Sequence, residues 1–183
     1  VTRWRPDGTR DDTGQFCYVK EVASGRTWST THQPTGALAD SYRAHLATDR
    51  VTIVRTDGAI ETRTEIAVMP KDAAEVRRVT LTNNGDETRE IELTSYGEIV
   101  LASRASDRVH PAFSNLFVET EWHEWCHAIT AARRPRSAEE KPLWCAHVLD
   151  TGPQRVGEVS FETDRARFLG RGRSTRVPQA LAP

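Results

Sequence analysis

Long apolar stretches, an excess of charge and a supply of cysteines are all missing from this sequence of 183 residues. The longest purely apolar stretches, such as 66–69 and 99–102, are four residues long, whereas a membrane-spanning helix needs about 20. The 25 Lys and Arg residues nearly cancel the 26 Asp and Glu residues, which leaves a net charge of −1. No whole-molecule field therefore favours nucleic acid or an anionic membrane surface, and we expect neither as a partner of this segment.

Cysteine and methionine are scarce. The three cysteines, Cys17, Cys126 and Cys145, are too few and too odd in number for a disulfide framework. We therefore expect buried or half-buried free thiols and a cytoplasmic location. The one methionine is Met69, no secretory leader is visible, and 177–183 carry no closing helix or strand signal. We interpret the sequence as a portion of a longer protein.

What is present is a polar composition with the patterning of strands. Apolar residues make up 37% and charged residues 28%, which fits a folded domain with a solvated surface. Nowhere do apolar residues recur with helical spacing over three turns. The sequence therefore predicts an all-β domain in which helix is the minor component.

Turn residues punctuate the strand-like segments. Asp57-Gly58 predicts a hairpin, because both central residues of a type I′ turn need positive φ. The run Asn-Asn-Gly-Asp at 83–86 predicts a second hairpin. Strands at this spacing, half apolar and half charged, favour stacked antiparallel sheets that each expose one face. The expected strands are 16–22, 42–46, 51–55, 59–69, 76–82, 90–101, 116–122, 128–132, 144–149 and 159–163, and the expected long loops are 103–114 and 133–142.

Residues 123–127 read His-Glu-Trp-Cys-His, which matches the H-E-x-x-H string of zinc proteases. In that mechanism two histidines one helical turn apart bind the metal, and the glutamate activates its bound water. The string lies between two strand-like segments, so we expect it to form their connection. A zinc-dependent hydrolase built on His123, Glu124 and His127 is the first alternative function.

Glu119 and Glu121 are paired carboxylates on a predicted strand. Their spacing puts both on one face about 7 Å apart, a separation open to inverting glycoside hydrolysis. Acidic strands supply such pairs by chance, and no G-x-S-x-G nucleophile motif is present. The sequence therefore assigns no catalytic residue to this segment.

Aromatic and arginine side chains are the candidates for ligand contact. Indole faces stack on sugar rings and also fill sandwich cores. Trp28 lies in the turn-rich stretch 24–34, and we expect it to be presented near a ligand or a neighbouring domain. Arg134, Arg171 and Arg173 are nominated as sugar or phosphate contacts by residue type and loop position. The five tryptophans of the chain are Trp4, Trp28, Trp122, Trp125 and Trp144.

Four stretches together resemble one family: 33–36, which reads Gln-Pro-Thr-Gly, then 75–96, 110–121 and 164–172. They are similar to the β-sandwich part of the glycoside phosphorylase-like region of cyclic β-1,2-glucan synthases, which is related to cellobiose and chitobiose phosphorylases. The likeness covers nearly the whole chain.

The resemblance implies a galactose-mutarotase-like supersandwich of two large antiparallel sheets, with 1–183 forming a single domain. It also implies that this domain precedes a helical (α/α)6 barrel that holds the general acid aspartate. None of the family's reaction groups matches a position in this chain, and no cofactor or metal is implied. The segment is then expected to support glucan binding and to pack on the barrel, without turnover of its own.

The resemblance further implies the partners and the location. A β-glucan or gluco-oligosaccharide, the helical barrel of the parent protein and a second copy in a homodimer are the expected partners. The larger protein is similar to enzymes that build β-1,2-linked glucose chains from UDP-glucose and are anchored in the inner membrane, with this region in the cytoplasm. A stand-alone carbohydrate-binding module is the second alternative function.

Overall fold

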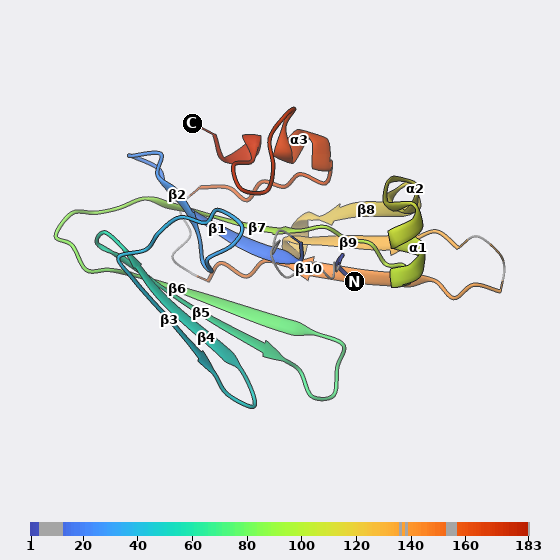
Figure 1. Ribbon diagram of the computed structural model, residues 1–183, viewed down its shortest axis with the longest axis horizontal. Helices are drawn as coiled ribbons and strands as arrows, with labels where there is room; N and C mark the ends of the chain where they lie inside the picture. The colour runs from blue at the N-terminus through green and yellow to red at the C-terminus, as the bar shows by residue number, and fades with distance from the viewer. Residues whose placement is uncertain (4–12, 136, 138, 153–156, 183) are drawn as a thin grey trace. The chain divides into compact units, whose positions relative to one another are not determined.

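The protein is described here by a computed structural model that covers residues 1–3, 13–135, 137, 139–152 and 157–182 (Figure 1). Trp4 lies outside the described residues. The described strands form three antiparallel sheets with the orders β2-β1-β7, β3-β4-β5-β6 and β10-β9-β8. The all-β antiparallel prediction is confirmed, although the strands are divided among three sheets rather than two large ones.

The chain folds as two compact units, which are described separately. Unit 1 contains Val1–Gln15 and Gly97–Phe168, and unit 2 contains Phe16–Tyr96 and Leu169–Pro183. A single sandwich domain over 1–183 stays a prediction. None of the helices in the described part of the chain combines the length and the apolar character needed to cross a membrane.

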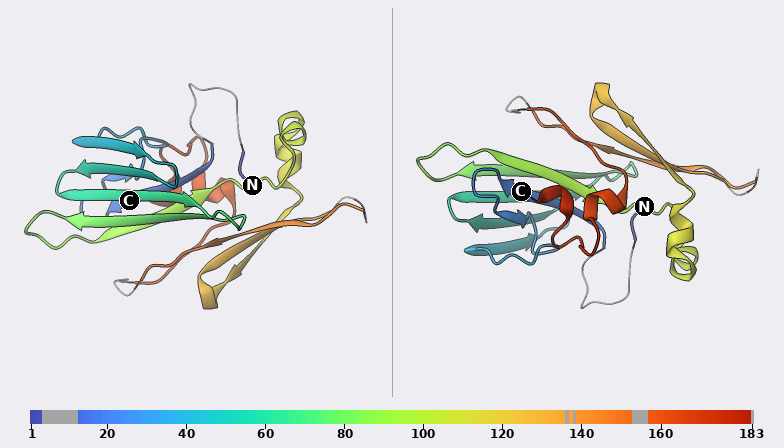
Figure 2. Two further views of the ribbon diagram at one scale, coloured as in Figure 1. Left: turned by 90° about the horizontal axis from the view of Figure 1, so that it is seen from below. Right: turned by 90° about the horizontal axis from the view of Figure 1, so that it is seen from above.

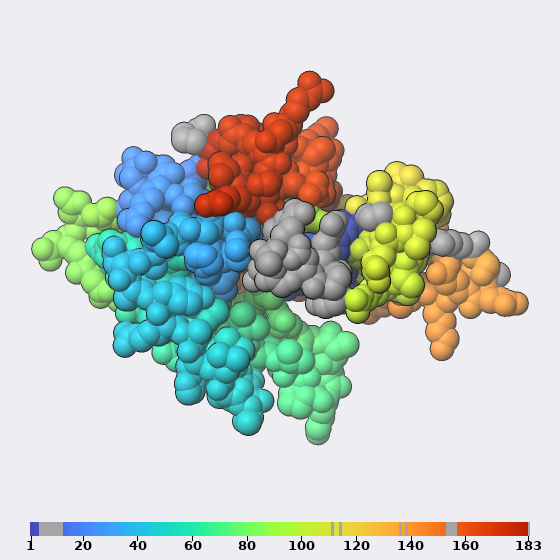
Figure 3. All heavy atoms as spheres, viewed as in Figure 1, coloured from blue at the N-terminus to red at the C-terminus, as the bar shows by residue number. Residues whose placement is uncertain are grey.

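The four-stranded sheet of unit 2 is a meander whose strands lie side by side (Figure 2). It is composed of β3 (Ser41–Leu46), β4 (Val51–Asp57), β5 (Ile60–Val68) and β6 (Glu75–Asn83). The edge strand β3 is exposed along its whole length and forms part of the light-blue surface in Figure 3.

The hairpin of β4 and β5 confirms the first turn signal with a shift of one residue. Asp57 pairs with Ile60, so the two-residue loop is Gly58-Ala59 rather than Asp57-Gly58. Gly58 has a φ of +63°, and Ala59 is not among the non-glycine residues of positive φ. This pattern is that of a type II′ turn, which needs glycine only at its first central position.

The second predicted hairpin is wrong, because β6 and β7 (Ile91–Gly97) belong to different sheets. The Asn83 side chain accepts a hydrogen bond from Gly85 N–H at 3.1 Å and donates one to the Glu87 carbonyl at 2.8 Å. These bonds shape a connection that leads from one sheet to the next. β7 lies beside β1 (Gln15–Glu21), which pairs on its other side with β2 (Thr27–Ser29).

The core of unit 2 draws side chains from both of its sheets. Val19 and Trp28 come from the three-stranded sheet and Ile60 from the four-stranded sheet, and all three are buried together. Ala37, Leu81 and Ile91 pack against this cluster. The chain end also joins unit 2, where Tyr18 donates a hydrogen bond to the Thr175 carbonyl at 2.7 Å and the 3-10 turn η2 (Gln179–Leu181) buries Leu181.

Unit 1 contains a sheet of β8 (Val118–His123), β9 (Ala128–Arg133) and β10 (Leu143–Val148). The loop expected over 103–114 contains two short helices instead, α1 (Arg104–Val109) and α2 (Pro111–Asn115). Ser103 caps α1 by accepting a hydrogen bond from Ser106 N–H at 3.3 Å, the usual role of serine at a helix start.

The strand expected over 159–163 is absent from the described structure, and this prediction is wrong. Phe161 instead stacks on Trp122 with ring centroids 4.5 Å apart. The short helix α3 (Arg165–Leu169) follows, and Arg165 reaches Glu98 at 2.8 Å. Side-chain stacking and ion pairing therefore hold this segment where the alternating pattern predicted a ladder.

Candidate functional site

Trp28 is the first predicted ligand contact, and the structure places it in the core. Its side chain is 1% exposed, opposite Val19 in the pairing of β1 and β2. The Arg26 guanidinium lies 5.7 Å from the centre of the indole ring. The expectation that Trp28 is presented to a ligand is therefore wrong, because neither face of the indole is open to solvent.

Arg134, Arg171 and Arg173 are all exposed, but they are divided between the two units. Arg134 follows β9 in unit 1, where its Nη1 lies 3.8 Å from Glu119 Oε1. Arg171 and Arg173 belong to unit 2 and follow Gly170, which has a φ of +82°. Their role in sugar contact stays a prediction.

The His-Glu-Trp-Cys-His string forms a tight connection between β8 and β9, as expected from the sequence. Glu124–Cys126 form one 3-10 turn, and His127 adopts the left-handed conformation with φ 47° and ψ 48°. His123 ends β8 and its Nε2 lies 2.9 Å from Thr130 Oγ1. The His127 ring stacks on Trp122 at 6.3 Å. The helical turn that would direct both imidazoles at one metal ion is not formed here.

No group of three or more His, Cys, Asp or Glu side chains in the described residues is arranged to hold a metal ion. The zinc hydrolase alternative would need such a group. In the described residues the H-E-x-x-H string forms a hairpin turn rather than the helical arrangement of a zinc protease.

Two of the three cysteines have raised pKa values, which make their thiols less reactive. All three are free and half-buried, which agrees with the expectation from the sequence. Burial raises the pKa of Cys17 to about 12, against a smaller lowering effect of Arg77. Burial also raises the pKa of the Cys145 thiol. Because the thiolate is the nucleophile, neither thiol is prepared for covalent chemistry.

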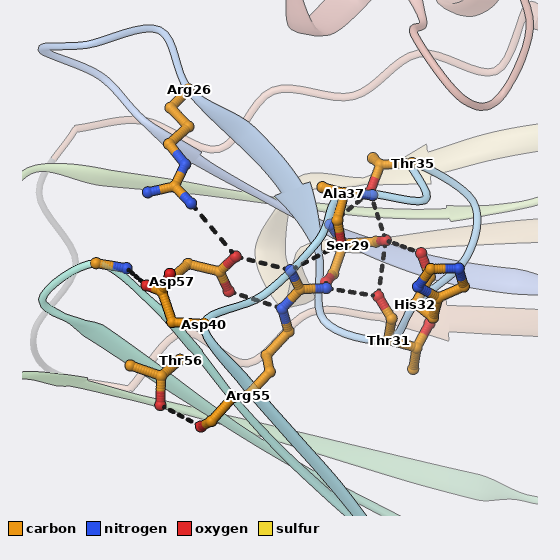
Figure 4. A network of polar contacts seen from close by, with 12 residues as sticks. Arg26, Ser29, Thr31, His32, Thr35, Ala37, Asp40, Arg55, Thr56 and Asp57 are labelled. Carbon is orange, nitrogen blue, oxygen red and sulfur yellow. Dashed lines mark hydrogen bonds and ion pairs between the residues drawn. The ribbon is translucent and has the colours of Figure 1, made fainter.

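Arg55 and Asp57 form a fully buried ion pair in unit 2 (Figure 4). Arg55 and Asp57 lie two apart on β4, and both side chains are 0% exposed. Arg55 Nε donates to Asp57 Oδ2 and Nη2 donates to Oδ1, each at 2.7 Å. This bidentate geometry is the strong form of an arginine–carboxylate pair.

The same guanidinium holds a loop by its backbone. Arg55 Nη1 donates to the carbonyls of Ser29 at 2.8 Å and Thr31 at 3.0 Å, and Nη2 donates to the carbonyl of Ala37 at 3.4 Å. Ser29 Oγ lies 2.9 Å from Thr35 Oγ1. We call residues 29–37 the clamped loop. It contains the Gln-Pro-Thr-Gly string, whose Gln33-Pro34 bond is cis.

The clamp gives the loop one fixed shape. Three carbonyls find donors inside the protein, and the guanidinium charge is balanced by a carboxylate, so the buried polar groups are mutually satisfied. Sequence reasoning did not select Arg55. An available signal was the R-x-D pattern on the inward parity of 51–57, because two charges on the buried face of a strand need each other.

The sheet of unit 1 exposes one face, which we call the Trp144 face. Cross-strand pairing and alternation place three rows on it, and each row crosses β8, β9 and β10 in turn. The rows are Glu119–Ala132–Trp144, Glu121–Thr130–Ala146 and His123–Ala128–Val148.

Exposure shows that the first two rows of the Trp144 face meet water, whereas Ala128 in the third row is 4% exposed. Trp144 is 71% exposed, and the side chains of Glu119 and Glu121 are 68% and 76% exposed. On the opposite face Ala131 and Arg133 are buried. Trp144 was not predicted as a ligand contact from the sequence, because its exposure depends on a strand register that only the paired strands reveal.

Unit 1 also contains a small hollow lined by residues that include Arg3 and Asp107. It measures about 70 Å³, well below the roughly 300–1,000 Å³ of ligand pockets. Arg3 spans it, donating from Nε and Nη2 to the two carboxylate oxygens of Asp107 at 2.9 and 3.0 Å. This pair fixes α1 and leaves no room for a sugar ring.

The three antiparallel sheets, with a two-sheet core in unit 2, define an all-β fold of the sandwich class. A family model for the Glycosyl hydrolase 94 supersandwich domain matches residues 1–183, and the chain belongs to this family. The resemblance drawn from the sequence is therefore confirmed.

Relatives with known names match the chain in whole or in part. It is 37% identical over 183 residues to the cyclic beta-(1,2)-glucan synthase NdvB of Rhizobium meliloti (strain 1021), which is 100% of this chain and 6% of that protein. It is 29% identical over 128 residues to an N,N'-diacetylchitobiose phosphorylase of Vibrio furnissii, covering 67% of this chain and 16% of that protein. A chitobiose phosphorylase of Vibrio proteolyticus is 28% identical over 109 residues, 58% of this chain and 14% of its own length. The chain thus spans a small part of the relatives that it matches.

Proposed function

We propose that the chain is the non-catalytic sandwich part of a carbohydrate-active enzyme that acts on β-glucan. It binds a gluco-oligosaccharide and packs on a helical (α/α)6 barrel supplied by the rest of the parent protein. The observation that carries the proposal is the match to the supersandwich family over 1–183, together with 37% identity to a cyclic β-1,2-glucan synthase over the same residues.

The clamped loop supports a shaping role. Arg55 and Asp57 are both fully buried and hold the backbone of residues 29–37 from inside. A loop fixed before its partner arrives loses little conformational freedom on contact, so it presents a defined surface at low entropic cost. His32 and Leu38 are exposed in and beside this loop.

The parent protein is proposed to be anchored in the inner membrane with this region in the cytoplasm, and to form a homodimer. The three free cysteines fit a reducing compartment. The near-balance of 25 basic and 26 acidic residues supports a neutral partner such as a glucan over nucleic acid.

Titration calorimetry and product analysis on the full chain test the proposal. We expect heat of binding at millimolar β-1,2-gluco-oligosaccharide. We also expect no product from UDP-glucose, or from the oligosaccharide with phosphate. Turnover by the chain alone would overturn the non-catalytic assignment. Absence of binding heat with every gluco-oligosaccharide would overturn the binding role.

Metal analysis separates the zinc alternative. After chelator washing and incubation with zinc, we expect no stoichiometric zinc on the chain and no change with His127→Ala. Zinc retained one to one and lost in His127→Ala would replace the proposal by a metal-dependent one.

A further inference from the structure

The Trp144 face of unit 1 is the surface on which the proposed glucan contact can be located. We propose that it is a binding platform for a neutral glucan chain, with Trp144 as the stacking residue and Glu119 and Glu121 as acceptors of sugar hydroxyls. The inference rests on the proposed function and names the site for it. It moves the predicted aromatic contact from Trp28 to Trp144.

The shape of the Trp144 face can accommodate a sugar ring. Its central row positions on β9 carry the small residues Ala128, Thr130 and Ala132. Trp144 on β10 and Glu119 on β8 stand on either side of Ala132. Two inter-strand spacings separate these walls by about 10 Å. The result is a shallow trough with an indole on one side and a carboxylate on the other.

The chemistry of the trough matches a polyol. An indole face attracts the C–H side of a pyranose, and carboxylate oxygens accept hydrogen bonds from hydroxyl groups. The next row places Glu121 across from Ala146 about 7 Å further along the strands. A second acceptor at that spacing can serve the next part of the same chain.

Charges on the face favour a neutral ligand over an ionic one. Arg134 Nη1 lies 3.8 Å from Glu119, and His123 Nε2 lies 4.0 Å from Glu121. Two carboxylates repel phosphate and acidic sugars, while the neighbouring arginine reduces the attraction for a cation. Arg134, nominated from the sequence as a sugar contact, lies beside Glu119 of the first row.

The two carboxylates also argue against a dry protein interface. Packing another sheet on the Trp144 face would remove Glu119 and Glu121 from water, and a buried carboxylate is costly unless it is fully paired. Exposed pairs at 3.8 and 4.0 Å do not supply such pairing. A hydrated sugar leaves the carboxylates in contact with water and hydroxyl groups.

Calorimetric titration of the full chain with a linear β-1,2-gluco-oligosaccharide tests the platform. We expect Trp144→Ala to weaken binding about tenfold and Glu121→Ala to weaken it by a smaller factor. The matched control is Trp125→Ala, because Trp125 is 87% exposed on the turn after β8 and is not on this face. Its affinity should equal that of the unmodified chain.

Each outcome has one meaning. Equal binding by the unmodified chain and Trp144→Ala would reject the platform and leave the proposed function in place. Absence of binding to the unmodified chain would reject both. Displacement of the sugar by tetramethylammonium at lower concentration than by glucose would show a cation site instead. A dimer that Trp144→Ala converts to monomer in gel filtration would show that the face joins two copies.

Discussion

The same residue types are buried in one unit and exposed in the other. Trp28 in unit 2 is 1% exposed and Trp144 in unit 1 is 71% exposed, although both lie on β-strands. Trp28 faces the second sheet of its own unit, whereas Trp144 lies on the side of a three-stranded sheet that meets solvent. The type of residue therefore does not decide between core and ligand surface. The decision lies in which face of the strand another layer covers.

Arginine repeats the contrast. Arg55 is buried and makes bidentate contacts of 2.7 Å with Asp57. Arg134 is exposed and stands 3.8 Å from Glu119. The first pair organises a loop from the inside, and loss of Arg55 leaves a buried carboxylate that has lost two hydrogen bonds and keeps the Arg26 guanidinium 3.7 Å away. The second pair is solvated, so its loss costs little.

Breaking the buried pair should give the largest effect. Arg55→Met removes both hydrogen bonds to the buried Asp57 carboxylate, which keeps the half-exposed Arg26 guanidinium 3.7 Å away, and it releases three carbonyls of the clamped loop. We expect the free energy of unfolding to fall by about 3–5 kcal/mol, as measured by urea denaturation. Hydrogen exchange at Gly36 N–H, which donates to the His32 carbonyl at 2.9 Å, should accelerate.

Two further variants control this test. Arg63→Met removes an exposed arginine from the neighbouring strand and should change stability by no more than about 0.5 kcal/mol. The double variant Arg55→Met with Asp57→Met should recover part of the loss, because no unpaired charge remains. A loss below about 1 kcal/mol in Arg55→Met would contradict the clamp.

The two tryptophans provide the second test. Trp28→Ala should lower the free energy of unfolding by about 3–5 kcal/mol, because it opens a cavity between Val19 and Ile60. Trp144→Ala should lower it by no more than about 0.5 kcal/mol. Urea denaturation of both variants gives the difference directly. Equal losses would mean that the Trp144 face is packed rather than open.

Turn residues and apolar alternation predicted the local hairpin well. They failed where pairing with a strand distant in sequence determines the path of the chain. The alternation over 51–69 predicted the hairpin of β4 and β5 to within one residue of its turn. Asn-Asn-Gly-Asp at 83–86 carried a turn signal of the same kind, yet the chain passes to another sheet there. Turn residues specify a change of direction, and pairing with β1 specifies where β7 goes.

The helices and the candidate sites show the same limit. α1 and α2 have six and five residues, too few for a helical period to appear in the sequence. The expectation for Trp28 failed because the turn residues around it in the sequence suggested a loop. Its pairing opposite Val19 instead places its side chain in the core. The carboxylate pair of Glu119 and Glu121 was correctly placed on one face, since alternation needs no distant information.

A smaller, pH-dependent effect is expected at Glu21 in unit 2. Hydrogen bonds from the Ser24 hydroxyl and the Arg89 guanidinium hold the pKa of the Glu21 carboxyl below its ordinary value of 4.5. A lowered pKa in the folded state adds stability above the ordinary pKa, and this gain is lost as pH falls through the lower folded value. Urea denaturation between pH 3 and pH 6 should therefore show the advantage over Glu21→Gln shrinking towards acid.

Ser24→Ala is the matched variant for Glu21. It removes the hydroxyl hydrogen bond that contributes most to the lowered pKa of Glu21 and keeps the carboxylate, so the acid dependence of stability should become shallower without disappearing. A stability difference between the unmodified chain and Glu21→Gln that stays constant over the same pH range would show that the carboxyl titrates alike in both states.

The exposed pair of Arg134 and Glu119 should give the smallest effect, and it completes the comparison with Arg55 and Asp57. A double-mutant cycle of Arg134→Met and Glu119→Gln should yield a coupling below about 1 kcal/mol. Salt should reduce it further, because both groups are solvated and 3.8 Å apart. A coupling that is large and insensitive to salt would mean that the Trp144 face is desolvated, and a platform open to a hydrated glucan could not exist there.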